Sequence, residues 1–215
     1  MSSFLRNLLT PKDEVVYFDV NTVDKGHHQV KYRGISALRC PFDYVIYQMI
    51  VTELKPDLII EIGTKFGGGT LYLADLMNSI DHGTIHSIDI LDQTSAVVKD
   101  HPRIKLFTKG WEEYDLSLTQ GYGKIMIIED ASHIYEDTLA AMEKFAAVVT
   151  KDSYFIIEDG IIDAIGKKKY YRGGPLKAIR EFLPHHPEYI VDRKWCNLFG
   201  KNATFNVNGY LKRTS

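Results

Sequence analysis

Two acid-rich stretches of this sequence could gather carboxylates at one place. Glu129 and Asp130 end the apolar run IIED, and Glu158 and Asp159 end the run FIIED. Carboxylates that converge repel one another unless a cation lies among them, and carboxylate oxygens are ligands that suit Mg²⁺. A substrate hydroxyl that replaced a water on such an ion would give up its proton more easily. The pattern therefore favours a magnesium site with an activated hydroxyl.

His133 lies three residues after Asp130 and is the natural base for that proton. Its ordinary pKa, about 6.5, suits proton transfer near neutral pH. Each residue also has a simpler interpretation. Asp130 or Ser132 could cap a helix that starts near 133, and Asp159 with the following glycine could form a turn. Taken together, and with a glycine-rich loop at residues 61–70 that could hold a ligand, these residues favour a site with a metal ion and a base.

A glycine-rich loop, EIGTKFGGGT at 61–70, follows the apolar run DLIIEI and precedes a helix-like pattern. A P-loop for nucleoside triphosphates would need lysine at the position of Gly69. The dinucleotide-binding pattern G-x-G-x-x-G would need glycine at the position of Lys65, whose side chain blocks the approach of a pyrophosphate. The loop therefore fits neither of these two classes of phosphate ligand.

S-adenosylmethionine fits the loop better, because its methionine part carries no phosphate and needs only a backbone that the ligand can approach closely. Asp89 ends the next apolar run, HSID, and could accept hydrogen bonds from ribose hydroxyls. Glu61 lies at the start of the loop, near the expected position of the cationic ligand. A plain strand-to-helix turn is the alternative, but four glycines followed by Asp89 favour ligand binding.

The elements that must position these residues alternate along the chain. Apolar runs predict strands at 57–62, 84–90, 103–109, 124–130 and 153–159, and helix-period patterns predict helices at 41–56, 70–80, 135–149 and 173–184. This alternation predicts an α/β fold with a mostly parallel sheet and helices on both faces. Ligands of such sheets bind beyond the carboxyl ends of the strands, where the glycine loop and the acids lie. The tail at 202–213 predicts an antiparallel edge strand or hairpin, with Asn208-Gly209 as a turn.

Length and composition limit the classes of protein to which this chain can belong. A chain of 215 residues with a net charge of −2 suits one domain, and it lacks the basic excess usual in nucleic-acid-binding proteins. No apolar run approaches the roughly 18–20 residues of a membrane span. The N-terminal segment has no apolar stretch of signal-peptide length, and the two cysteines form neither a metal spacing nor a disulfide framework. We therefore expect a cytoplasmic protein.

An ordered set of segments over about residues 30–213 resembles one known family. The segments include KPDLIIEIGTKFGGGTLYLADLM, GTIHSIDI, IIEDASHIYEDTLAAM, VTKDSYFIIEDG and FNVNGYLKR. The chain resembles the cephalosporin hydroxylase and rhamnosyl O-methyltransferase family, within the class I S-adenosylmethionine-dependent methyltransferases. The resemblance implies a Rossmann-like fold in one domain over 1–215, with a seven-stranded, mostly parallel sheet and a C-terminal antiparallel hairpin. Residues 1–56 would form an N-terminal helical cap on the substrate side.

The resemblance also implies the residues of the site. The donor, S-adenosylmethionine, would be bound by Glu61, Gly63, Thr64, Lys65, Gly67, Gly68, Asp89, Gly110, Trp111 and Asp130, with Gly110 and Trp111 near the adenine. Mg²⁺ would be held by Asp130, Glu158 and Asp159, and the catalytic residues would be Asp130 and the base His133. Relatives often read D-x-D-H, where this chain has Ser132 in place of the second acid. Either Asp130 provides the ligand, or the metal site is weakened or absent.

These expectations describe an enzyme that uses S-adenosylmethionine and Mg²⁺ to methylate a hydroxyl of a small molecule, above all a sugar or glycoconjugate in natural-product tailoring. A cofactor-binding protein without transferase activity is one alternative. An oxidative tailoring enzyme is another, but the eight histidines show no two-histidine, one-carboxylate iron set and cluster only as His27-His28 and His185-His186.

The loop at 165–175 follows the last predicted parallel strand and would overhang the site. It carries four cations and two tyrosines: Lys167, Lys168, Lys169, Arg172, Tyr170 and Tyr171. They could recognise a phosphate-bearing acceptor, such as a nucleotide-linked or lipid-linked sugar, and a solvated basic loop is the alternative. Tyr32 and Arg33 are further candidate contacts. Aromatic content and the relatives favour a homo-oligomer.

Overall fold

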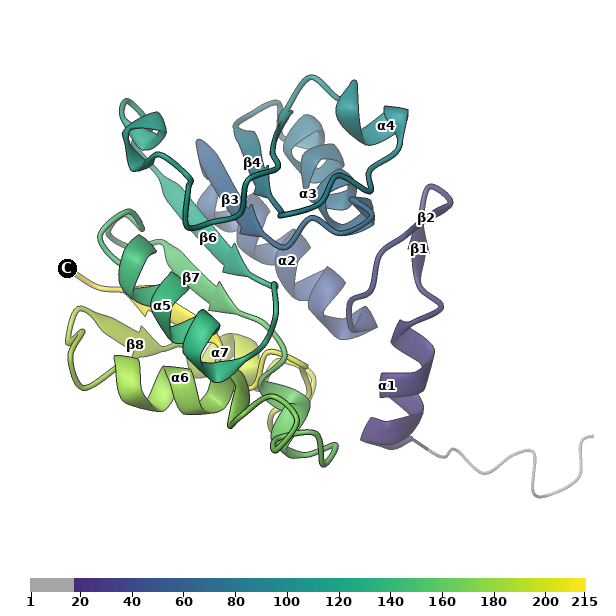
Figure 1. The fold of residues 1–215 in the computed structure, drawn as a ribbon, viewed down its shortest axis with the longest axis vertical. Helices are drawn as coiled ribbons and strands as arrows, with labels where there is room; N and C mark the ends of the chain where they lie inside the picture. Colours follow the sequence, from purple (N-terminus) through teal and green to yellow (C-terminus); the bar gives the residue numbers. More distant parts are fainter. Residues whose placement is uncertain (1–17) are drawn as a thin grey trace, which may run out of the picture.

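The computed structural model describes residues 18–215, so residues 1–17 of the expected N-terminal cap lie outside the described residues. The described chain contains a seven-stranded sheet (Figure 1). In sheet order, the strands are β5 (Ile104–Phe107), β4 (Thr84–Ile88), β3 (Leu58–Ile62), β6 (Ile125–Glu129), β7 (Tyr154–Ile157), β9 (Tyr210–Arg213) and β8 (Tyr189–Val191). The first five strands in this order, β5, β4, β3, β6 and β7, pair in parallel. Strand β9 is antiparallel to both β7 and β8. The predicted α/β class and the mostly parallel sheet with an antiparallel hairpin are confirmed.

Helices cover both faces of the sheet. On one face, α2 (Pro41–Leu54) and α3 (Gly68–Ser79) pack against strand residues that include Ile59. On the other face, α5 (Tyr135–Phe145) and α6 (Gly174–Phe182) pack against residues that include Leu58 and Ile60. The two α5 and α6 helices lie side by side in Figure 1. Successive residues of β3 thus enter opposite cores, as the alternation of side chains along a strand requires.

Shorter elements complete the fold. They are α1 (Val20–His27), the two-stranded hairpin of β1 (Lys31–Tyr32) and β2 (Ile35–Ser36), α4 (Ala96–Lys99), α7 (Arg193–Cys196) and two 3₁₀ turns, Leu116–Thr119 and Gly160–Asp163. The β1–β2 hairpin contacts α3, so the chain before α2 runs past the glycine-rich loop at the start of α3.

Proline and the left-handed backbone set the ends of the predicted helices. Helix α2 begins with Pro41, whose missing N–H costs nothing in a first turn, and ends at Leu54, where the next residue, Lys55, has a left-handed backbone. Helix α6 begins after Gly173 and carries Pro175 in its first turn. Both helices lie where the sequence predicts them.

Of the two alternatives predicted for the tail, an antiparallel edge strand or a hairpin, the edge position is wrong. Only Tyr210–Arg213 of the range 202–213 forms a strand, and it lies inside the sheet between β7 and β8 and not at the edge. The edge strand on this side of the sheet is β8, which has three residues and is too short for the apolar pattern to reveal. The predicted turn at Asn208-Gly209 is confirmed. Asn208 is left-handed, and a Cβ on Gly209 would lie 1.9 Å from the carbonyl oxygen of Ile157.

The strand order places a topological switch at β3. From β3 the chain continues to β4 and β5 on one side, then returns to β6 on the other side. Ligands of open α/β sheets bind at such a point, beyond the carboxyl ends of the strands. None of the helices within residues 18–215 has the length and apolar character needed to cross a membrane.

Candidate active site

A cavity of about 620 Å³ lies at this switch point. Its walls come from four parts of the chain: 24–39 before α2, 61–69 after β3, 130–134 after β6 and 159–172 after β7. The glycine loop and the acid-rich strand ends therefore face one shared space, as the sequence predicts for parallel strands. A much smaller hollow, whose lining includes Thr64 and Asp89, lies beside it.

The glycines of the loop bring parts of the backbone together. Gly63 has φ of +106°, and a Cβ there would lie 2.1 Å from the carbonyl oxygen of Asp130. A Cβ on Gly68 would lie 2.3 Å from the carbonyl oxygen of Ser36. Gly67 precedes α3 in a left-handed conformation. These glycines therefore let the loop after β3 approach its neighbours, in addition to the ligand role expected from the sequence.

Asp89 is tied to the glycine loop by hydrogen bonds. The Lys65 backbone N–H donates to Oδ2 of Asp89 at 2.7 Å, and the Ile90 N–H donates to its Oδ1 at 2.7 Å. The Gly110 N–H donates to the Asp89 carbonyl at 3.1 Å. Asp89 lines a small hollow next to the main cavity, and Thr64 lines both.

Trp111 has a different environment from that of the loop residues. Its side chain is half-buried and packs against the core that α5 and α6 share with the sheet. Gly110 and Trp111 follow β5 and are not part of the wall of the main cavity. Of the predicted donor residues, the structure thus brings Gly110 next to Asp89 and leaves Trp111 at the side of the site.

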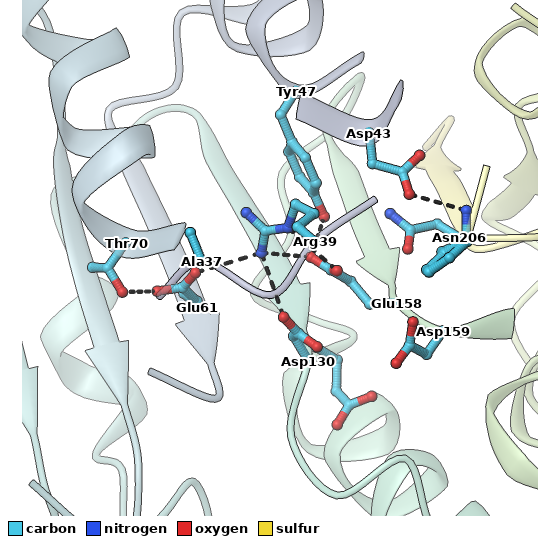
Figure 2. A network of polar contacts seen from close by, with 12 residues as sticks. Ala37, Arg39, Asp43, Tyr47, Glu61, Thr70, Asp130, Glu158, Asp159 and Asn206 are labelled. Carbon is cyan, nitrogen blue, oxygen red and sulfur yellow. Dashed lines mark hydrogen bonds and ion pairs between the residues drawn. The ribbon is translucent and has the colours of Figure 1, made fainter. Parts of the chain in front are cut away.

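Arg39, which no motif of the sequence indicated, connects three strand ends. Its guanidinium nitrogen Nη2 lies 2.7 Å from Glu158, 3.5 Å from Asp130 and 3.7 Å from Glu61 (Figure 2). Arg39 is only 4% exposed, and its guanidinium also lies over the ring of Tyr47. The one available signal was a lone cation in the otherwise apolar SALRCPF, directly before α2.

Glu158 is held entirely by these residues. The Tyr47 hydroxyl donates to its Oε1 at 2.7 Å, and Nε of Arg39 donates to its Oε2 at 3.3 Å. Glu61 accepts hydrogen bonds from the hydroxyls of Thr70 and Ser87. Burial raises the pKa of Glu61. Two of the strand-end carboxylates are therefore satisfied by the protein itself.

Two further acids, Asp130 and Asp159, line the cavity itself. Burial raises the pKa of Asp130 well above its usual range, and the Glu158 carboxylate raises it further, against the opposing effect of Arg39. Ligand atoms of Asp130, His133 and Asp159 lie within 4.8 Å of one another. The structure therefore brings together two of the three predicted metal ligands and the predicted base, with Glu158 turned toward Arg39.

His133 stands between the two cavity-facing carboxylates. Its Nε2 lies 3.2 Å from Oδ2 of Asp159 and 3.8 Å from Oδ1 of Asp130. Its Nδ1 is buried and has no hydrogen-bond partner in the part of the chain that is described. The ring contacts Tyr171 edge-on at 5.9 Å between centroids. His133, the base predicted from the sequence, therefore lies in contact with both Asp130 and Asp159.

Ser132 makes local hydrogen bonds just before and in the first turn of α5. Its hydroxyl donates to Asp137 at 2.8 Å and accepts from the Ile134 N–H at 3.2 Å. Helix α5 has Ile134 as its N-cap and no side-chain cap hydrogen bond, so the capping role considered for Asp130 or Ser132 is not seen. Asp130, and not Ser132, is the member of this segment that reaches the acid cluster.

The basic loop is largely paired within the protein. Lys167 lies 3.2 Å from Asp24, and Lys168 lies 3.0 Å from Asp163. Tyr170 is 81% exposed and packs edge-on against Tyr171. Tyr32 and Arg33, the other candidate contacts, both bind Asp75 of α3 and do not line the cavity.

Comparison with known proteins finds relatives that match nearly the whole length of this chain. The model of the family described as Rhamnosyl O-methyltransferase/CmcI matches residues 24–214. The rhamnosyl O-methyltransferase of Mycobacterium leprae (strain TN) is 29% identical over 228 residues, which cover 97% of this chain and 98% of that protein. A solved structure of CmcI with SAH has a TM-score of 0.69 at 20% identity, covering 97% of each chain. Another, of CmcI with Mg-SAM, has a TM-score of 0.66 at 23% identity, covering 87% of this chain and 78% of that one. The two structural likenesses confirm the fold.

Proposed function

Because this chain belongs to the Rhamnosyl O-methyltransferase/CmcI family, we propose that it transfers a methyl group from S-adenosylmethionine to a hydroxyl group of a sugar. The observation that carries this proposal is the shared cavity. The glycine loop after β3 and the cluster of Asp130, His133 and Asp159 line the same space. A methyl donor and a hydroxyl acceptor must meet in one place, and only proximity and alignment are then needed, because the sulfonium donor is already activated.

The donor is proposed to lie along the glycine loop. Glu61, Gly63, Thr64, Lys65 and Gly68 line the cavity or its rim, with Gly67 at the start of α3. Asp89 is proposed to accept hydrogen bonds from the ribose, with Gly110 and Trp111 toward the adenine. The half-exposed Asp89 carboxylate already orders this region through its bond to Lys65.

The acid cluster fits a divalent cation. Asp130 and Asp159 offer hard oxygen ligands, and the single charge of Arg39 does not balance the three carboxylates around it. Asp130 and Asp159 are proposed to hold Mg²⁺, which would supply Lewis acidity toward a nearby hydroxyl. Glu158 stays a predicted third ligand, and its Oε2 would have to leave Nε of Arg39 to act as one.

His133 is proposed to take the proton of the acceptor hydroxyl on Nε2. The step requires the imidazole tautomer that carries its proton on Nδ1. As the acceptor oxygen forms its bond to the methyl carbon, the bond from that carbon to the donor sulfur breaks, and a neutral thioether leaves. Asp159, at 3.2 Å from Nε2, stabilises the imidazolium that results.

The acceptor class follows from the relatives and from the walls of the cavity. The curated relatives are rhamnosyl O-methyltransferases, and a rhamnoside is therefore the first acceptor to test. The tyrosines at 170 and 171 could stack on a sugar ring. Because Lys167 and Lys168 are paired with Asp24 and Asp163, recognition of a phosphate-bearing sugar stays a prediction. The homo-oligomer and the cytoplasmic location also stay predictions.

The test combines donor binding and turnover. Isothermal titration of S-adenosylmethionine with and without Mg²⁺ separates binding from metal-dependent catalysis, and mass spectrometry detects a methylated product in a panel of rhamnosides, other glycosides and non-sugar alcohols. We expect donor binding in both conditions, and methylation of a rhamnoside that stops when EDTA removes the cation. Donor binding without transfer to any acceptor would support a binding protein instead. Oxidation of an acceptor without methylation would support the oxidative alternative.

A further inference from the structure

The cavity has a second polar wall, opposite the strand ends and formed by the last turn of α1. Asp24 and His27 are one helical turn apart on the same face, and His28 follows directly. All three residues line the cavity. One ligand atom from each lies within 4.8 Å of the other two. The expectation that the histidines form no set of two histidines and one carboxylate is therefore wrong, because the fold places Asp24 beside the pair His27-His28.

His27 carries a buried nitrogen that lacks a partner. The residue is 8% exposed, and its Nδ1 accepts and donates no hydrogen bond within the described residues. The nearest carboxylate oxygen, Oδ1 of Asp24, lies 3.7 Å away, which is too long for a hydrogen bond. A buried polar atom without a partner is costly and calls for a ligand or another explanation.

Packing fixes the His27 ring in this position. It lies edge-on to Phe205 at 5.1 Å and over the ring of His28 at 4.0 Å. A neutral imidazole ring has a lone pair for a metal ion, which a protonated ring does not.

The cluster already holds one cation at its edge. Nζ of Lys167 lies 3.2 Å from Oδ2 and 3.4 Å from Oδ1 of Asp24. A metal ion on Asp24 would therefore compete with this ammonium for the same carboxylate. The lysine comes from the loop after β7, so a change at this cluster would also reach the loop that covers the cavity.

We propose that Asp24, His27 and His28 form a second cation site, which binds a transition-metal ion such as Zn²⁺ on the wall facing the acid cluster. Imidazole nitrogens suit such ions, whereas carboxylates alone suit Mg²⁺. Three protein ligands leave a coordination position open toward the cavity, where an oxygen of a bound molecule can enter. The site rests on the geometry of α1, so its existence does not depend on the proposed methyl transfer.

The probe for this site is Co²⁺, whose visible absorption reports its coordination. The tag-free full chain is titrated with Co²⁺ in excess Mg²⁺, so that the hard acid cluster is occupied by the lighter ion. We expect one equivalent of Co²⁺ to bind with a tetrahedral or five-coordinate spectrum. Asp24→Asn and His28→Ala should weaken binding at least about tenfold, since even outer-shell partners of a metal matter by that factor. His28 is exposed, so its loss should leave the fold intact.

Matched variants separate this site from other sources of the signal. His185→Ala removes an exposed histidine from the other pair and should leave Co²⁺ binding unchanged, as should Asp130→Asn. Lys167→Met removes the competing ammonium and should tighten binding. Equal Co²⁺ affinity in the parent chain and the His28→Ala variant would overturn the proposal, as would a signal that disappears with Asp130→Asn. Unchanged affinity in Lys167→Met would overturn the role of Asp24 as a ligand.

Discussion

Nε2 of His133 lies 3.2 Å from Oδ2 of Asp159, although the two residues belong to loops after different strands. Both residues have left-handed backbones, with φ of 57° in each. This conformation costs a non-glycine residue of the order of 1 kcal/mol or more, and it recurs at functional sites as well as in turns. The fold stabilises both residues in it, and the result is a base directed at an acid across the cavity.

Replacing His133 should separate chemistry from donor binding. His133→Asn is the better variant, because asparagine tolerates the left-handed backbone that alanine does not. Losing a general base should lower kcat by about 10²–10⁴-fold, while the Kd of S-adenosylmethionine stays within about threefold. Single-turnover rates and calorimetry measure the two quantities, with His185→Ala as a surface control. An unchanged rate in the His133→Asn variant would remove His133 from the mechanism.

Removing Arg39 should destabilise the fold. Arg39→Met leaves Glu61 and Glu158 buried without their cation, and breaking a buried ion pair in this way typically costs about 3–5 kcal/mol. The free energy of unfolding in urea measures the loss. Arg33→Met is the matched control, because Arg33 is half-exposed and pairs with Asp75 near the surface. Its removal should cost under about 1 kcal/mol. Equal effects of the two variants would contradict the role assigned to Arg39.

Substitution of Gly63 should affect both halves of the site together. Gly63→Ala places a methyl group 2.1 Å from the Asp130 carbonyl oxygen and strains a backbone at φ of +106°. We expect a loss of more than about 3 kcal/mol in unfolding free energy, together with weaker binding of donor and of Mg²⁺. Gly121→Ala controls for the backbone alone, because Gly121 has φ of +89° and open space around it. It should cost only about 1–2 kcal/mol. Similar losses in both variants would show that the contact with Asp130 is unimportant.

Asp43 should make stability depend on pH. Its carboxylate is fully buried, accepts hydrogen bonds from the Phe205 N–H and the Tyr210 hydroxyl, and has its pKa raised by burial to about 7. Because this is above its usual value, the folded chain holds a proton between about pH 4 and 7 that the unfolded chain releases. The contribution of Asp43 is therefore fully present at about pH 4 and is lost as the pH rises through 7.

Asp43→Asn should remove this dependence. Asparagine can accept from the Phe205 N–H with its oxygen and donate to the Tyr210 hydroxyl with its nitrogen. The stability of the variant relative to the parent should rise between pH 4 and 8, by up to roughly 4 kcal/mol at about 1.4 kcal/mol per pH unit. Urea unfolding at several pH values measures it, and exposed Asp100→Asn should show no such rise. Parallel curves for the Asp43→Asn variant and the parent would refute the prediction.

Local patterns predicted the elements that bury apolar residues in a regular way. The runs around Leu58–Ile62 and Ile125–Glu129 are apolar because both faces of these strands are covered, and their ends locate the acids. The strand Tyr189–Val191 is not predicted from the sequence, because three residues are too few to show the alternation of a strand. The tail pattern allows both an edge strand and a hairpin, because pairing on both sides depends on β7 and β8, which lie outside the tail sequence.

The parts of the site that the sequence did not reveal depend on long-range contacts. Arg39 bonds to Glu158, 119 positions away, and to Asp130, 91 positions away. No local period records such a partner. Asp24 joins His27 and His28 through ordinary helical spacing, yet the set is informative only once the fold directs that face of α1 into the cavity. His133 was predictable because its partner Asp130 is close in sequence and follows a recognisable strand.

The position of β9 between β7 and β8 has a consequence for how the protein is made. Tyr210–Arg213 leave the ribosome after every other strand of the sheet, yet they fill the gap between β7 and β8. Until then, β7 exposes unpaired N–H and C=O groups along one side, and such an edge readily pairs with other nascent chains. The strand that delivers Glu158 and Asp159 is therefore the one whose environment is completed last during synthesis, and chaperone protection should matter most at that stage.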